Sequence, residues 1–133
     1  MGKINLVVII DDDPIYVFGL QKLIEIDNFA SEVKTFINGK ESLEYIENSF
    51  KESLNLPDVI LLDINMPVMN GWEFLDLINP LSKLYSKKLN IYVVSSSVSD
   101  EDRTRALSFS IVKDYLIKPI TLESLEKIRS KIE

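Results

Sequence analysis

The sequence predicts an α/β protein, built as a doubly wound, five-stranded parallel sheet with five helices. Short runs of apolar, β-branched residues recur along the chain, as is typical of strands buried on both faces. Segments with apolar residues at helical spacing separate these runs. Because strands that alternate with helices need crossover connections, the sheet is expected to be parallel and covered on both faces.

The elements of the first half follow from the apolar runs and from the residues that end them. Asp13 precedes Pro14, which favours the first helical position, so Asp13 is expected to cap the first helix. Asn38-Gly39 turns the chain before the second helix. The predicted elements are a strand over 4–10, a helix from Pro14 to about 26, a strand over 32–36, a helix over 40–50 and a strand over 58–63.

The second half continues the alternation. Asn79-Pro80 is expected to halt the third helix, because proline cannot continue a helical hydrogen-bond ladder. Ser99 and Thr121 are expected to cap the last two helices. Residues 81–90 form a connection of uncertain shape. The predicted elements are a helix from 72 to about 78, a strand over 91–94, a helix from 100 to about 109, a strand over 115–118 and a helix from 122 to 132.

Composition limits the classes of function. The 133 residues suit one domain over 1–133, and the net charge of -6 argues against direct contact with nucleic acid. The chain has no cysteine and no histidine, which excludes disulfides, thiolate metal sites and a Ser-His-Asp triad. The apolar run before Asp11 is too short for a membrane span and lacks a signal-peptide cleavage site. We therefore expect a cytoplasmic protein that does not contact membranes.

Polar residues stand at the predicted carboxyl ends of four strands, where open α/β sheets bind ligands. They are Asp11, Asp12, Asp63, Ser95 and Lys118. Carboxylates about 4 Å apart repel by roughly 4 kcal/mol at an effective dielectric near 20, and a hard divalent cation such as Mg²⁺ removes that repulsion. A phosphoryl group on Asp63 could then pair with the Lys118 ammonium and the Ser95 hydroxyl.

Each of these residues alone has an ordinary structural explanation. A lone aspartate at a strand end is usually a helix cap or a solvated loop residue, and we assign Asp13 to that role. A lone Lys-Pro is usually a turn, and Ser95 begins a run of three serines that could simply fill a loop. Their joint placement at four strand ends favours a functional site.

The chain resembles the receiver domain of two-component response regulators across essentially the whole length of the chain, and four segments carry the resemblance. Asp63, Met66-Pro67 and Gly71 follow one another with the spacing of that family. The matching segments are 8–14, 61–71, 93–96 and 114–119. The resemblance implies a flavodoxin-like sheet with strand order 2-1-3-4-5.

The resemblance also implies a metal site and a phosphoacceptor. Asp63 would accept the phosphoryl group. Asp11 and Asp12 would be the acidic pair, one of them a direct metal ligand and the other acting partly through water. The backbone carbonyl of Asn65 would complete the protein's ligands to Mg²⁺, for which Mn²⁺ could substitute. Three consecutive aspartates leave the pair ambiguous, and the helix start at Pro14 favours the first two.

Other residues gain roles by the same resemblance. Ser95 would supply the hydroxyl that moves toward the phosphoryl group, and Lys118 its cationic partner, with a cis peptide bond between Lys118 and Pro119. Tyr115 would rotate inward when Ser95 moves, altering the surface of the fourth helix, fifth strand and fifth helix. Ser96 matches a position that the family keeps small, so that the phosphodonor can approach.

The resemblance further suggests partners and regulation. The donor histidine would come from a sensor histidine kinase or a histidine phosphotransfer protein, because this chain has no histidine. Asn65 and Ser97 would flank the path of the hydrolytic water and tune the phosphoryl lifetime. The chain ends with its last helix, so we expect a stand-alone receiver with an unidentified downstream protein target, monomeric or dimerising on phosphorylation. We expect no turnover of a separate substrate.

Three alternatives compete with this interpretation. A pseudo-receiver would share the fold but bind proteins without being phosphorylated, and the complete set of acidic and basic residues argues against it. A phosphatase that forms a phosphoaspartate would carry an acid two residues after Asp63, where this chain has Asn65, a poor proton donor. A flavin- or nucleotide-binding domain is disfavoured because no glycine-rich loop follows the first strand.

Overall fold

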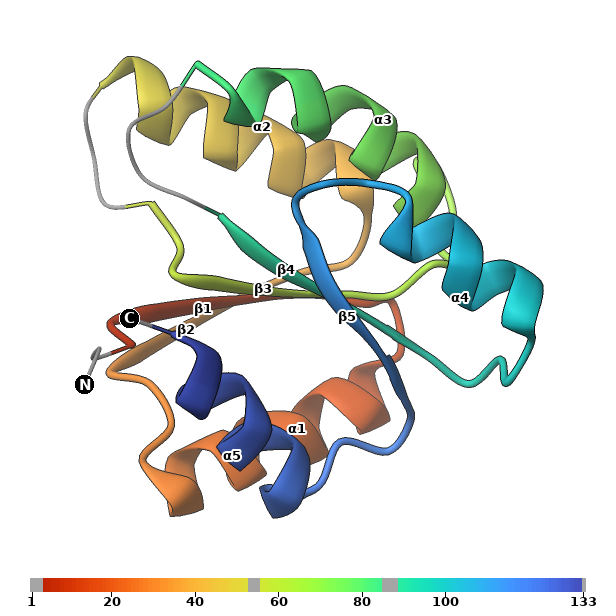
Figure 1. The fold of residues 1–133 in the computed structure, drawn as a ribbon. Helices are drawn as coiled ribbons and strands as arrows, with labels where there is room; N and C mark the ends of the chain where they lie inside the picture. Colours follow the sequence, from red (N-terminus) through yellow and green to blue (C-terminus); the bar gives the residue numbers. More distant parts are fainter. Residues whose placement is uncertain (1–3, 53–55, 85–88, 133) are drawn as a thin grey trace.

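The computed structural model of the protein describes residues 4–52, 56–84 and 89–132. In these ranges five strands and five helices alternate along the chain (Figure 1). The strands are β1 (Leu6–Ile10), β2 (Glu32–Phe36), β3 (Val59–Leu62), β4 (Asn90–Ser95) and β5 (Val112–Ile117). The helices are α1 (Pro14–Asp27), α2 (Gly39–Lys51), α3 (Gly71–Ser82), α4 (Asp100–Leu107) and α5 (Leu122–Lys131). Among these helices, none combines the length and apolar character needed to cross a membrane.

The five strands form one parallel sheet in the order β2-β1-β3-β4-β5, which confirms the predicted fold. Successive side chains of a strand point to opposite faces. Val8 and Ile10 of β1 therefore join one buried cluster, while Val7 and Ile9 join another. Figure 1 shows α2, α3 and α4 over the first face, and α1 and α5 over the second.

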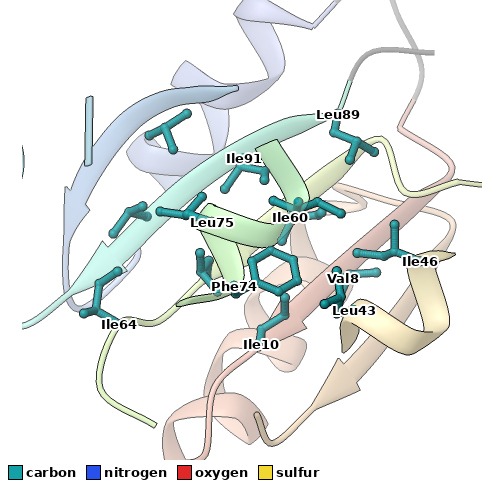
Figure 2. Close-up of a cluster of buried hydrophobic side chains, with 14 of the residues drawn as sticks. Val8, Ile10, Leu43, Ile46, Ile60, Ile64, Phe74, Leu75, Leu89 and Ile91 are labelled. Atoms are coloured by element: carbon teal, nitrogen blue, oxygen red, sulfur yellow. The ribbon is translucent and has the colours of Figure 1, made fainter. Parts of the chain in front are cut away.

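Phe74 lies at the centre of the cluster beneath α2 and α3. It is fully buried among side chains of β1, β3 and α2, including Ile10, Ile60 and Ile46 (Figure 2). Truncating a buried phenylalanine to alanine typically costs about 3–5 kcal/mol, so this contact is a main support of the layer. It also anchors the helix that follows the loop after β3.

The strand register brings several carboxyl ends to the same edge of the sheet. Ile10 pairs with Leu62, and Leu62 pairs with Val93. The next residues after β1 and β3 are Asp11 and Asp63. Both residues continue the backbone hydrogen bonding of the sheet. The Asp11 N–H donates to the Phe36 carbonyl at 3.0 Å, and the Asp63 N–H donates to the Ile10 carbonyl at 2.9 Å.

Helix α3 is longer than expected, and the prediction that Asn79-Pro80 would end it is wrong. The helix continues through Pro80 to Ser82. Its last turn is closed by 3₁₀-type hydrogen bonds, from the Lys83 N–H to the Pro80 carbonyl and from the Leu84 N–H to the Leu81 carbonyl. Leu81 also packs against the core, which favours one further turn beyond the proline.

The fifth strand also begins earlier than expected, at Val112 rather than at Tyr115. Val112 is buried and pairs with Ile91, and an irregularity of register follows between Ile91 and Tyr92. The start was mispredicted because the charged Lys113 interrupts the apolar residues of the strand. Lys113 faces solvent on this edge strand, whereas its neighbour Val112 is buried. The other predicted ends agree to within two residues, and part of the predicted connection over 81–90 lies outside the described residues.

Candidate functional site

The side chains of Asp11, Asp12 and Asp63 meet at the carboxyl edge of the sheet. One carboxylate oxygen of each can be chosen so that all lie within 4.8 Å of one another. Asp11 and Asp63 are buried, with only 4% and 7% of their surface exposed, whereas Asp12 faces solvent. A cup of oxygen donors with one open side suits a hard cation that keeps several of its waters, as Mg²⁺ does.

Lys118 contacts both buried carboxylates. Its ammonium nitrogen lies 2.9 Å from Asp11 Oδ2 and 3.5 Å from Asp63 Oδ1. The backbone brings it there, since the Lys118 N–H donates to the Ser95 carbonyl at 2.9 Å. The Lys118–Pro119 peptide bond is cis, as the resemblance implied. The ammonium thus provides a positive charge between two carboxylates that would otherwise repel each other.

The surroundings raise the pKa values of both Asp63 and Lys118. Burial, and next the negative charge of Asp11, raise the pKa of Asp63 from 3.8 to about 6, although Lys118 and the Ile64 N–H oppose the rise. Burial alone lowers the pKa of Lys118, but its hydrogen bond to Asp11 and the charges of Asp11 and Asp63 raise it overall. At neutral pH Asp63 is therefore mostly ionised beside a protonated Lys118.

The loop after β3 is held against Asp63 by a close backbone approach at Gly71. The Gly71 N–H donates to the Ile64 carbonyl at 2.8 Å. A Cβ at this position would lie 2.5 Å from the Asp63 carbonyl oxygen, nearer than real Cβ atoms come to any neighbour. Only glycine fits there without movement, which explains why the α3 start must be glycine in this geometry.

Comparison with known proteins decides the family. The family model of the response regulator receiver domain matches residues 7–130. The chain belongs to the response regulator receiver family. It is 38% identical over 123 residues to the nitrate/nitrite response regulator protein NarL of Escherichia coli K12, covering 91% of this chain and 51% of NarL. This receiver chain therefore spans about half of NarL's length.

Solved structures agree with this membership. A two-component response regulator from Cytophaga hutchinsonii superposes with a TM-score of 0.89 at 29% identity, over 98% of each chain. The phosphorylated cyanobacterial phytochrome response regulator RcpA superposes with a TM-score of 0.75 at 26% identity, over 93% of this chain and 87% of RcpA. The receiver fold thus extends over nearly all of the chain.

Ser95, Ser97 and Tyr115 are connected in this receiver. Ser95 is buried, and its hydroxyl oxygen accepts a hydrogen bond from the Ser97 N–H at 3.1 Å. The Ser97 carbonyl accepts from the Tyr115 hydroxyl at 2.8 Å. Tyr115 is only 3% exposed, so its ring already lies inward in this structure. The sequence predicted these three residues but not the hydrogen bonds that link them through the backbone of Ser97.

The remaining residues assigned by resemblance lie in loops at the same edge. Asn65 is exposed, two residues beyond Asp63. Ser96 is exposed directly after β4, and Pro119 is exposed after Lys118. Their exposure is compatible with access from solvent to the carboxylates.

The sequence did not point to two residues with contacts at this site. The Tyr16 ring lies under the Lys118 ammonium, 4.3 Å from nitrogen to ring centroid, and no motif in the sequence pointed to Tyr16. Arg103 of α4 donates to the Tyr115 carbonyl at 3.3 Å and lies 3.5 Å from Asp114 Oδ1. No sequence pattern pointed to Arg103, because its partners are on another element.

Proposed function

We propose that this receiver accepts a phosphoryl group from a histidine of a partner protein onto Asp63 and thereby switches a protein-interaction surface. The observation that carries the proposal is the contact of Lys118 with Asp11 and Asp63 beside the exposed Asp12. Apolar residues would pack this place at least as stably as two buried carboxylates and one ammonium, so packing does not explain the charged groups.

Asp11, Asp12 and Asp63, with the backbone carbonyl of Asn65, would hold Mg²⁺, and Mn²⁺ could substitute. The three carboxylates fit such an ion because they converge closely and offer only oxygen donors. When bound, the ion would offset the repulsion between the carboxylates and the charge on the phosphoryl oxygens.

In the proposed reaction, an oxygen of the Asp63 carboxylate attacks the phosphorus of a phosphohistidine. The new O–P bond forms as the P–N bond breaks, and the imidazole stays with the donor protein. Asp63 must be ionised to attack, which its pKa of about 6 allows at neutral pH. Lys118 would then pair with a phosphoryl oxygen as a point charge.

The readout would pass from the phosphoryl group to the Ser95 hydroxyl. Movement of Ser95 would break its hydrogen bond with the Ser97 N–H, and Ser97 is in turn bonded to Tyr115. Because Tyr115 lies on β5 beside α4, the proposed output surface is that of α4, β5 and α5. Asn65 and Ser97 would tune the lifetime of the phosphoryl group.

The proposed partners are a sensor histidine kinase or a histidine phosphotransfer protein, and a downstream protein target. We propose a receiver that acts in the cytoplasm and catalyses its own phosphorylation and hydrolysis but turns over no separate substrate. The existence of a phosphorylated structure of the relative RcpA supports phosphorylation as the switch.

The decisive experiment is incubation with acetyl phosphate and Mg²⁺, followed by intact-mass spectrometry. We expect one phosphoryl group on the wild-type protein, and none on Asp63→Asn or in the presence of a chelator. The adduct should be labile to hydroxylamine, as an acyl phosphate is and a serine phosphate is not. Exchange of the exposed Asp76 of α3 for asparagine is the matched control and should leave uptake unchanged.

The same experiment tests the alternative of a pseudo-receiver. A wild-type protein that gains no mass with any small phosphodonor would favour a binding module that acts without phosphorylation. A hydroxylamine-stable adduct, or uptake by Asp63→Asn, would contradict the assignment of Asp63.

A further inference from the structure

The aromatic ring of Tyr16 forms one wall of the place where the Lys118 ammonium lies. The nitrogen is 4.3 Å from the ring centroid, well inside the range in which the negative face of an aromatic ring attracts a cation. Lys118 is only 20% exposed, so water screens this attraction weakly. The ammonium is thus held by Asp11, by Asp63 and by a neutral ring.

Local hydrogen bonds fix the position of Tyr16. Asp13 accepts the Tyr16 N–H at 3.2 Å as the cap of α1. The Asp13 N–H itself donates to Asp11 Oδ1 at 2.9 Å. The contacts therefore close a circuit from Asp11 through Asp13 and Tyr16 to Lys118, which returns to Asp11 at 2.9 Å. Because of these bonds, the position of the ring is coupled to the loop that carries Asp11 and Asp12.

The hydroxyl of Tyr16 does not account for this placement. It is buried, and it finds no hydrogen-bond partner within 4–52, 56–84 and 89–132. A buried hydroxyl without a partner is unfavourable, so the hydroxyl does not explain why an aromatic residue stands here. The ring itself is the part of Tyr16 that contacts the site.

We propose that Tyr16 is a positioning residue, whose ring face holds the Lys118 ammonium within reach of Asp63. The inference rests on the proposed function of Lys118. A divalent ion on the carboxylates would weaken the attraction of Asp11 for Lys118, because it would neutralise part of that charge. The attraction of the ring is independent of the charge on Asp11, and so keeps the ammonium beside Asp63 when the phosphoryl group arrives.

The contact is tested first by NMR on the free protein. A proton that lies over an aromatic face is shifted upfield by the ring current. The ε-methylene protons of Lys118 should be shifted upfield in the wild type and in Tyr16→Phe, and should return to ordinary values in Tyr16→Leu. This readout needs neither metal nor phosphodonor.

The role is tested by the rate of phosphorylation with acetyl phosphate and Mg²⁺. Tyr16→Phe should stay within about twofold of the wild type, whereas Tyr16→Leu should be slower by roughly threefold to thirtyfold, the range that a partly desolvated cation–π contact supplies. Phe18→Leu is the matched control, since it removes a ring of the same helix that lies 5.5 Å from another lysine, Lys22. It should leave the rate unchanged.

Thermal unfolding separates positioning from loss of fold. Tyr16→Leu should remain folded at the assay temperature and should be slow only in the reaction. Equal rates for wild type and Tyr16→Leu, a Tyr16→Phe as slow as Tyr16→Leu, or a Lys118 without an upfield shift would each overturn the inference alone. A wild-type protein that takes up no phosphoryl group would overturn the proposed function, and the inference with it.

Discussion

The phenol of Tyr115 and the backbone carbonyl of Ser97 share a hydrogen bond of 2.8 Å. Ser97 also donates its N–H to the Ser95 hydroxyl at 3.1 Å, so one residue of the loop after β4 contacts both side chains of the proposed switch. The Arg103 side chain of α4 donates to the Tyr115 carbonyl at 3.3 Å. Tyr115 is thus held at two points, its hydroxyl by the backbone carbonyl of Ser97 and its own carbonyl by the side chain of Arg103.

Replacement of Tyr115 by phenylalanine removes one of these bonds and keeps the ring. The free energy of unfolding should fall by about 1 kcal/mol, because the Ser97 carbonyl loses its partner in a half-buried place. Urea unfolding at constant pH measures this change. Tyr92→Phe is the matched control: its hydroxyl is buried without a hydrogen-bond partner in the described ranges, so that variant should be equally or more stable. A loss of equal size in both variants would contradict the role of the Ser97 bond.

Replacement of Asp63 by asparagine should stabilise the metal-free protein at neutral pH. Burial and the charge of Asp11 raise the pKa of Asp63 from 3.8 to about 6, so the folded state binds this proton more tightly than the unfolded chain. Stability from this carboxyl is therefore lost as pH rises from about 4 to 6, and the loss above that window is roughly 1–3 kcal/mol. Asp63→Asn avoids the loss.

The pH dependence is the diagnostic part of that prediction. The difference in unfolding free energy between Asp63→Asn and wild type should be largest at pH 7 and should shrink toward pH 4, where both side chains are neutral in the folded state. Denaturant unfolding in a chelating buffer across this range measures it. The exposed Asp76→Asn on α3 provides a comparison for the loss of one solvated charge. A difference that stays constant with pH would mean that Asp63 is not the titrating group.

Replacement of Gly71 by alanine should destabilise the protein. The added Cβ would lie 2.5 Å from the Asp63 carbonyl and 2.8 Å from Ile64 Cα, and both are backbone atoms that cannot rotate away. Overpacking of this kind typically costs about 1–3 kcal/mol. Gly19→Ala on α1 is the matched variant, because nothing lies within 4 Å of its Cβ, and it should stabilise by roughly 0.5–1 kcal/mol. Thermal unfolding of the two variants should therefore move in opposite directions.

Much of this structure could be predicted because local and long-range signals agree. Residues 59–62 and 91–94 are apolar on every position, as strands with two covered faces must be, and Asp63 and Ser95 then follow from the sheet edge. The end of α3 was mispredicted, because packing of Leu81 outweighs the local preference of Pro80. Local rules do not include such a tertiary contribution.

The contacts of Tyr16 and Arg103 could not be predicted for a related reason. Both depend on which side chains two distant elements bring together, at Lys118 and at Tyr115. Helical spacing places Tyr16 on the inner face of α1. The same spacing is expected whether its ring only packs in the core or also contacts an ammonium, so the sequence pattern does not distinguish the two. Only the geometry of the loop before Pro119 distinguishes them.

Val68 has a strained backbone conformation, and its replacement by glycine should stabilise the protein. Its φ is 69°, and the Met69 N–H donates to the Pro67 carbonyl across it at 2.8 Å, which forms a tight γ-turn. Such strain in a β-branched residue amounts to roughly 1–3 kcal/mol, while the extra freedom of glycine in the unfolded chain costs about 0.5–1 kcal/mol. The side chain is 74% exposed, so little packing is lost.

The net gain for Val68→Gly should thus be up to about 2 kcal/mol, measured by urea unfolding. Val98→Gly is the matched control, since Val98 is 80% exposed in another loop of the same sheet edge and is not among the described residues with positive φ. That variant has no strain to release, and the entropy of glycine should destabilise it by about 0.5–1 kcal/mol. Equal destabilisation by both changes would show that the turn at Val68 stores no strain.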